Sequence, residues 1–151
     1  MGNKSHFSGT EQDQISKEIE RLHQFFIDWF NGVVPKTEAS FKQFRDATAD
    51  DFSIVPPSGE LVPIKSLAEG LYNAYNKRPG LNIEVKNMQI QHKMGNFYLA
   101  TYEEWQLEKG DKAWRGRIST ALLSKDENAP AGLKWHHVHE TWLPENSVKA
   151  I

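Results

Sequence analysis

Four long stretches in the second half of the chain constrain the fold most, because each is rich in β-branched and aromatic residues. Such residues favour strands. The links between the stretches are short and contain Gly, Asn or Pro, and strands joined in this way pair antiparallel with their neighbours. The sequence therefore predicts an antiparallel meander of four strands, at residues 82–92, 97–107, 113–125 and 133–143.

The first predicted strand changes the parity of its apolar side chains. Ile83 and Val85 stand at odd positions, whereas Met88 and Ile90 stand at even ones. An extra residue near positions 86–87 produces such a slip, and a β-bulge of this kind bends the strand. We therefore expect a curved sheet.

The first half of the chain predicts helices. Apolar residues recur at spacings of three and four between residues 11 and 31, which is one face of an amphipathic helix: Ile15, Ile19, Leu22, Phe26, Trp29 and Phe30. Thr10 favours its start and Gly32 its end. A shorter helix follows Thr37, and a brief strand (52–55) and a helix (64–75) come next. Helices followed by a curved antiparallel sheet predict an α+β domain in which the aromatic helix crosses the concave face.

Composition excludes several classes of function. A chain of 151 residues fits one domain; we predict an N-terminal arm (1–10), a domain (11–146) and a C-terminal tail (147–151). The formal charge of −2 offers no basic surface for nucleic acid. The absence of cysteine excludes thiolate chemistry, and no apolar run is long enough to span a membrane. We expect a cytoplasmic protein without nucleic-acid or membrane partners and without a cofactor.

The last predicted strand carries the most unusual side chains. Residues 133–144 contain three of the six histidines and two of the five tryptophans. Simple alternation places Trp135, His137, His139 and Thr141 on one face of that strand. A face that mixes aromatic and titratable groups suits the wall of a semi-polar cavity.

The order of these elements, with the segment 49–59, the helix 64–75 and the closing segment 135–139, resembles the NTF2-like superfamily. The SnoaL-like or DUF4440 proteins and the association domain of calmodulin-dependent kinase II are the branches it is most similar to. The resemblance covers residues 15–144. It implies a cystatin-like cone with a cavity at the open end, and a homodimer formed through the sheet.

The resemblance argues against ketosteroid isomerase chemistry. Where those enzymes carry a general-base Asp, an oxyanion Tyr and a protonated Asp, this chain has Pro56, Phe25, and Thr120 or Ala121. None of these side chains moves a proton at neutral pH.

Two histidines are the candidates for chemistry. His137 and His139 share a spacing that allows two imidazoles to reach one metal ion. A third ligand is missing from the pattern, so we expect hydrogen-bonded histidines and no metal. Either imidazole with Glu103 makes a possible acid–base pair, and the alternative is a salt bridge that holds the sheet.

A ligand pocket is the second hypothesis. Arg115 and Arg117 share a strand face, and paired guanidinium groups bind carboxylates, although a row of intersubunit salt bridges fits equally well. The predicted lining adds His137 and His139 to four aromatic residues: Trp29, Tyr102, Trp105 and Trp135.

Three functions remain open at this point. The first is a homodimeric domain that binds a small organic molecule, such as a carboxylate or an aromatic compound. The second is a cofactor-free isomerase, dehydratase or cyclase that uses a His–Glu pair. The third is an oligomerisation module without a ligand.

Overall fold

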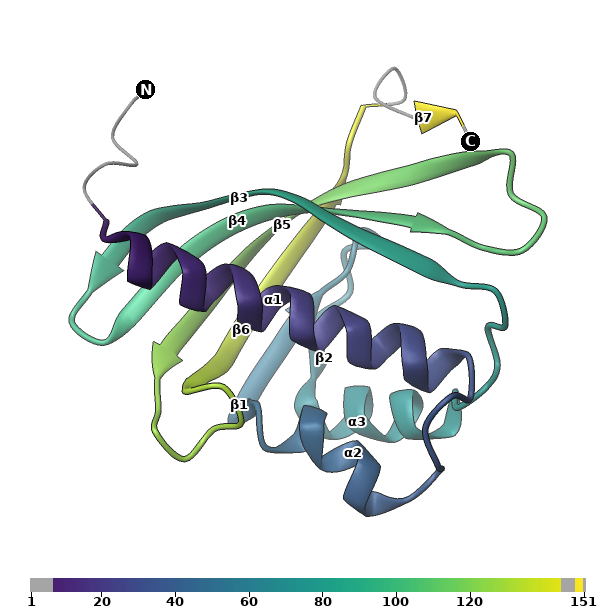
Figure 1. Ribbon diagram of the computed structural model, residues 1–151, viewed down its shortest axis with the longest axis horizontal. Coiled ribbons are helices and arrows are strands. Elements are labelled where there is room, and N and C mark those ends of the chain that lie inside the picture. Colours follow the sequence, from purple (N-terminus) through teal and green to yellow (C-terminus); the bar gives the residue numbers. More distant parts are fainter. Residues whose placement is uncertain (1–6, 145–148, 151) are drawn as a thin grey trace.

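The computed structural model describes residues 7–144 and 149–150, so most of the predicted arm and tail lies outside the described residues. A single long helix, α1 (Gly9–Phe30), runs beside the sheet (Figure 1). Ser8 caps this helix in a reciprocal pair with Glu11, the arrangement known as a capping box. The helix therefore begins before the predicted Thr10, because Ser8 rather than Thr10 satisfies the free N–H groups of the first turn.

Two shorter helices close one end of the molecule. Helix α2 (Glu38–Arg45) starts at the predicted cap, since the hydroxyl of Thr37 accepts from the backbone N–H of Ser40 at 3.1 Å. Helix α3 (Ile64–Asn73) follows the hairpin made by β1 (Thr48–Val55) and β2 (Val62–Pro63). Strand β1 is longer than the predicted 52–55, and its first residue, Thr48, already pairs with Trp135 of β6.

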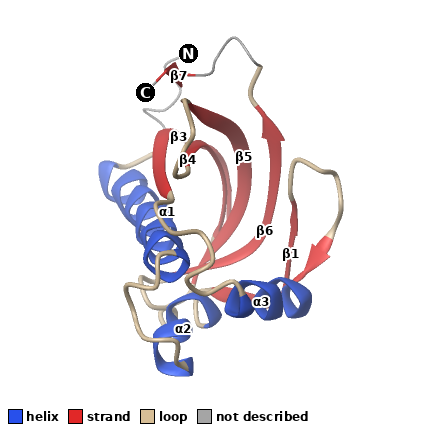
Figure 2. Ribbon diagram, turned by 90° about the vertical axis from the view of Figure 1, so that its right-hand side faces the viewer, coloured by secondary structure: helices blue, strands red, loops and turns tan. Residues whose placement is uncertain are grey.

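The four predicted strands are all present, as β3 (Asn82–Met94), β4 (Phe97–Leu107), β5 (Ala113–Lys125) and β6 (Leu133–Trp142). They form an antiparallel meander in the order β6-β5-β4-β3. Strand β1 extends the sheet by pairing parallel with β6, and a short strand β7 (Lys149–Ala150) pairs with β5. The sheet curves around α1, and all three helices lie on its hollow side or at its end (Figure 2). The prediction of an α+β domain is confirmed.

Bulges bend the sheet at two places that matter for function. The pairing of β3 with β4 shifts after Lys86, and Asn87 there has a φ of 55°, so the predicted bulge is confirmed. A second irregularity was not predicted. Leu122 pairs with His137 while Leu123 pairs with Trp135, which leaves His136 as an extra residue in β6. Trp135 and His137 therefore face opposite sides, and the prediction that they share a face is wrong.

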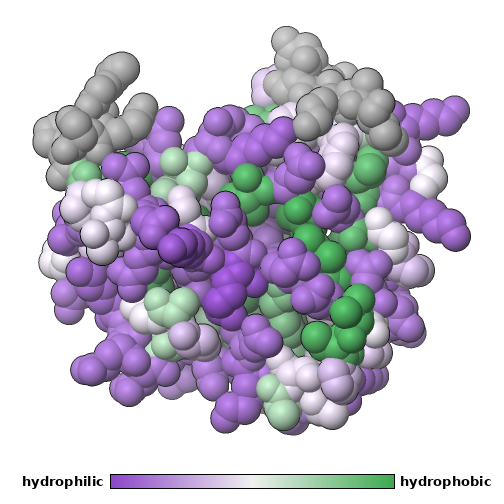
Figure 3. Space-filling model, viewed as in Figure 1, coloured by the Kyte–Doolittle hydropathy of each residue, from purple (hydrophilic) through white to green (hydrophobic). Residues whose placement is uncertain are grey.

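The core lies between α1 and the concave face of the sheet. Its largest fully buried side chains include Trp29 of α1, Trp135 of β6, and Tyr98 and Tyr102 of β4. Burying an aromatic side chain of this size contributes about 2–3 kcal/mol of hydrophobic stabilisation. Hydrophilic residues cover much of the face shown in Figure 3. None of the helices within residues 7–144 is long and apolar enough to cross a membrane.

Candidate functional site

A cavity of about 180 Å³ lies on the inner side of the sheet, between α1, α3 and strands β1, β4, β5 and β6. Most of its wall is apolar, and it includes Phe26, Phe30, Leu67 and Val138. Five titratable side chains also line it: His23, Tyr102, Glu104, Arg117 and Glu140. We call these five residues the inner polar cluster.

The inner polar cluster is held together by hydrogen bonds within the chain. His23 places its Nε2 3.2 Å from Glu104 Oε1, and its Nδ1 lies 2.7 Å from the carbonyl oxygen of Ile19. With a carbonyl on one ring nitrogen and a carboxylate on the other, the imidazole has two acceptors and no donor. This geometry favours the protonated ring.

The second pair of the cluster joins neighbouring strands. Arg117 donates from Nη1 to Glu140 Oε1 at 2.9 Å, and Ser119 adds a longer contact of 3.4 Å to the same carboxylate. The Nε of Arg117 is buried and has no hydrogen-bond partner within the described part of the chain. The guanidinium group is thus held by one carboxylate at one of its nitrogens.

Burial and neighbouring charges shift the pKa values of the cluster in opposite directions. Burial alone lowers the pKa of His23, but the Glu104 carboxylate outweighs burial and raises it above 6.5. Burial alone raises the pKa of Glu104, and His23 together with Arg117 lowers it to about 2. Burial and the charge of Glu104 raise the pKa of Glu140. The mutual interaction of His23 and Glu104 therefore favours the charged forms of both groups.

A second buried carboxylate lies beside the cavity. Glu18 is fully buried on α1, where Arg21 donates to it at 2.7 and 3.0 Å and the indole N–H of Trp135 donates at 2.8 Å. The contact with Trp135 joins α1 to β6, whereas the two contacts with Arg21 lie within α1. The Glu18 carboxylate has a structural role, because both of its oxygens already accept hydrogen bonds from within the chain.

A groove of about 460 Å³ lies on the opposite, outer side of the sheet. No helix among residues 7–144 covers this side in Figure 2. Seven uncharged or imidazole side chains of β4, β5 and β6 line it: Leu99, Ile118, Thr120, Leu122, His137, His139 and Thr141. We call this set the outer groove.

The bulge in β6 explains why the two histidines line the outer groove. His136 adds one residue to the strand, so His137 and His139 turn outward while Val138 and Glu140 turn inward. His137 is half-buried and its Nδ1 lies 2.9 Å from the hydroxyl of Ser53 on β1. His139 is exposed. Neither imidazole lines the inner cavity.

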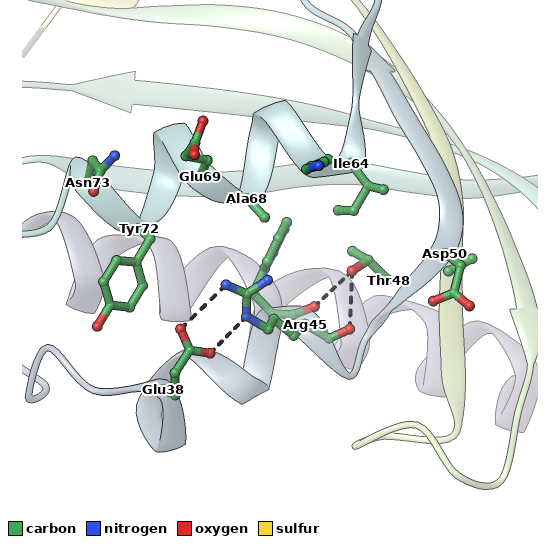
Figure 4. Close-up of a pocket in the computed structure, with 12 residues that line it drawn as sticks. Glu38, Arg45, Thr48, Asp50, Ile64, Ala68, Glu69, Tyr72 and Asn73 are labelled. Atoms are coloured by element: carbon green, nitrogen blue, oxygen red, sulfur yellow. Dashed lines mark hydrogen bonds and ion pairs between the residues drawn. The ribbon is translucent and has the colours of Figure 1, made fainter.

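A hollow of about 570 Å³ forms an open crevice between α2, α3 and β1 (Figure 4). Arg45 and Glu38 form a two-pronged ion pair along one side, at 2.9 and 3.4 Å. Glu69 and Asn73 project from the helix on the other side. The Arg45–Glu38 pair is exposed to solvent, which makes the crevice a weaker candidate for chemistry than the buried cluster.

The predicted lining residues separate into several places. Tyr102, Arg117 and Trp135 line the inner cavity, whereas Trp29 is buried in the core, where its indole N–H donates to the carbonyl oxygen of Leu71 at 2.8 Å. Arg115 stacks over the exposed Trp142, with its guanidinium carbon 4.0 Å from the ring centre.

The proposed acid–base pair of a histidine with Glu103 is not formed. Glu103 pairs with Ile118, which pairs with Thr141, so Glu103 and His139 lie two strands and two residues apart, roughly 12 Å between backbones. The Glu103 carboxylate instead accepts from the indole N–H of Trp105 at 2.9 Å. Trp105 covers Gly116 and does not line the inner cavity.

Sequence reasoning missed three members of the inner polar cluster, His23, Glu104 and Glu140. A signal was present for His23, because it lies one turn after Ile19 and next to Leu22 on the apolar face of α1. A titratable residue inside an apolar stripe is a buried group that needs a partner. For Glu104 the signal was its position among the residues of β4 that point inward by alternation. For Glu140 the same alternation in β6 was misleading, because the bulge at His136 was not predicted.

Comparison with known proteins adds a family. The model of the family described as the sucrose-6-phosphate phosphohydrolase C-terminal domain matches residues 8–144. Among curated proteins, a probable sucrose-phosphatase 3a of Arabidopsis thaliana is 25% identical over 132 residues. That match covers 86% of this chain and 30% of the relative, so the chain spans about a third of the relative's length.

Solved structures share the fold. An NTF2-like protein of unknown function from Pseudomonas aeruginosa is 26% identical, with a TM-score of 0.77 over 87% of this chain and 99% of that one. The calmodulin-dependent kinase II hub of S. rosetta is 12% identical, with a TM-score of 0.64 over 87% of this chain and 96% of that one. The predicted NTF2-like fold is confirmed.

These findings correct the predicted function. We predicted a domain that binds small organic ligands in a semi-polar cavity, with an isomerase, dehydratase or cyclase as the alternative. This prediction is wrong, because the family model and the curated relatives indicate that the chain is similar to one domain of sucrose-phosphatases. The inner cavity agrees with this correction, since its titratable groups largely pair with one another. The family named is also neither the SnoaL-like nor the DUF4440 branch. The chain belongs to the sucrose-6-phosphate phosphohydrolase C-terminal family.

Proposed function

We propose that this domain is a non-catalytic accessory domain that acts together with a sucrose-6-phosphate phosphatase unit. We further propose that it self-associates through the outer groove. The family match over residues 8–144 carries the first part of the proposal. The greater part of each curated relative lies outside the match, which leaves room there for a separate catalytic unit.

The composition of the outer groove supports the second part. It contains exposed apolar surface, since Ile118 is 42% exposed on β5, where it lies between Glu103 of β4 and Thr141 of β6. Contiguous exposed apolar surface on a sheet marks an interaction site. The groove has no carboxylate, lysine or arginine in its lining, so no like charges within the lining oppose a second copy of the same groove.

A related architecture supports self-association as well. The structural relative from S. rosetta is described as a hub, and another structural relative is described as a calmodulin-dependent kinase II association domain. A homodimer formed through the sheet is the simplest closed assembly that buries one such face on each chain. We therefore assign the outer groove to a twofold, self-complementary contact.

Sedimentation equilibrium tests this contact. The chain is expected to dimerise, and Ile118→Asp is expected to weaken dimerisation about a hundredfold or more, because each copy buries an unpaired carboxylate at the interface. Val33→Asp is the matched control, since Val33 is an apolar residue that is 72% exposed outside the groove. A chain that stays monomeric at high concentration, or an Ile118→Asp variant that dimerises like the wild type, overturns the proposal.

A phosphate-release assay with sucrose 6-phosphate tests the non-catalytic part. The domain alone is expected to release no phosphate above the rate in buffer. Release that saturates with sucrose 6-phosphate and scales with the concentration of the domain contradicts an accessory role.

A further inference from the structure

Two histidines of the outer groove are placed like metal ligands. His137 and His139 are two residues apart on β6 and both line the groove, so their imidazoles project from the same side of the sheet. Imidazoles at this spacing on a strand reach a single metal ion of the zinc type, with nitrogen–metal distances of about 2.0–2.1 Å.

A neighbouring serine orients one of these rings. His137 Nδ1 lies 2.9 Å from the hydroxyl of Ser53, and the two residues are direct partners in the pairing of β1 with β6. When Nδ1–H donates to this hydroxyl, the lone pair is on Nε2, the other ring nitrogen. A hydrogen bond of this kind to the non-ligating nitrogen is the usual support of a metal-binding histidine.

One chain supplies only these two ligands. No group of three or more His, Asp or Glu side chains able to hold a metal occurs among residues 7–144. Glu103 is about 12 Å away between backbones and bonded to Trp105, as described above. His136 is engaged with Ser124 at 2.7 Å. A stable zinc site needs a third or fourth ligand, so the site is incomplete in a single copy.

We propose that His137 and His139 bind Zn²⁺ at the twofold contact, where the same two imidazoles of a second copy complete a tetrahedral four-nitrogen site. The inference rests on the self-association proposed above, because only a second copy of the groove brings further imidazoles to this position. The apolar neighbours Ile118 and Leu122 exclude water from the site, and no carboxylate of the groove competes for the ion. Zinc then links the two copies without any chemical reaction.

Calorimetric titration of the metal-free chain with zinc chloride, followed by sedimentation equilibrium, tests the site. We expect one zinc ion per two chains, and a dimer dissociation constant lowered about tenfold or more by saturating zinc. The paired variant His137→Asn with His139→Asn is expected to lose zinc uptake and the zinc-dependent gain in dimerisation. It keeps its fold, as circular dichroism verifies, because both side chains lie outside the core.

His92→Asn is the matched control. His92 pairs with Leu99, which pairs with Leu122 and through it with His137, so its imidazole lies on the same face but three strands, roughly 14 Å, away. This variant is expected to bind zinc like the wild type.

The outcomes separate the site from the proposed function. A dimer that takes up no zinc overturns the metal site and leaves self-association intact. Zinc binding at one ion per chain with no effect on dimerisation overturns the shared site. A chain that is monomeric with and without zinc overturns self-association, and the shared site with it.

Discussion

Glu103 and Glu104 are neighbours on β4, yet they lie in opposite environments. Glu104 points to the inner side, is 95% buried, and is paired with His23. Glu103 points to the outer side, is only partly buried, and accepts one hydrogen bond from Trp105. The same contrast separates the inner polar cluster from the outer groove along all three central strands.

The contrast shows which polar and apolar side chains have partners within the chain and which do not. In the inner polar cluster, His23 is paired with Glu104 of another element and Arg117 with Glu140 of another element, and both carboxylates are buried. On the outer side, apolar and imidazole groups have few partners within the chain. Groups without internal partners are the ones free to bind another molecule, which is why we assign association to the outer side and stability to the inner side.

The largest expected effect breaks the inner pair. Glu104→Gln leaves the buried His23 without its carboxylate partner, and removing one partner of a buried ion pair costs about 3 kcal/mol or more of unfolding free energy. Glu103→Gln on the outer side is the matched control, with an expected loss below about 1 kcal/mol. Urea unfolding measures both values, and equal losses for the two variants contradict the distinction between the two sides.

The pH dependence of the stability difference between wild type and Glu104→Gln tests whether His23 and Glu104 are both charged. Because the pKa of Glu104 is lowered from 4.5 to about 2, its contribution is present above about pH 4.5 and is lost as the pH falls toward 2. Because the pKa of His23 is raised above 6.5, its contribution is present below pH 6.5 and is lost as the pH rises through the raised value. The stability difference between wild type and Glu104→Gln is therefore expected to be largest between about pH 4.5 and 6.5. A difference that stays constant from pH 3 to 9 argues against a charged pair.

A smaller effect tests a packed part of the outer side. A Cβ added at Gly116 lies 2.8 Å from the ring of Trp105, so Gly116→Ala displaces the indole and is expected to cost about 1–3 kcal/mol. Gly70→Ala on α3 meets no atom within 4 Å and is expected to stabilise the protein by about 0.5–1 kcal/mol, because alanine favours helix. Thermal unfolding of the two variants gives opposite shifts of Tm if Trp105 packs on Gly116; a neutral Gly116→Ala places the indole elsewhere.

Much of the fold was readable from the sequence because it depends on local patterns. The spacing of Ile15, Ile19 and Leu22 predicted α1, and the parity change after Val85 predicted the bend in β3. The parallel pairing of β1 with β6 was not readable, because it joins segments more than eighty residues apart.

The candidate site was predicted less well than the fold. Simple alternation placed Trp135 and His137 on one face, and a single extra residue, His136, reversed every side chain after it. The sequence around His136 did not predict a bulge, because its neighbours are Trp135 and His137 and neither is Gly or Pro. The histidines consequently moved from the predicted cavity to the opposite side of the sheet.

The sequence by itself determined the element types, the curvature of the sheet and the aromatic core, because helix and strand periodicities and turn residues act over a few neighbouring positions. Only the tertiary structure decided which titratable groups meet. His23 and Glu104 are eighty-one positions apart, and their pairing depends on how α1 lies across the sheet and on the register of the strands. The same register, shifted by one residue in β6, separated the histidines from that cluster and turned them toward the outer groove.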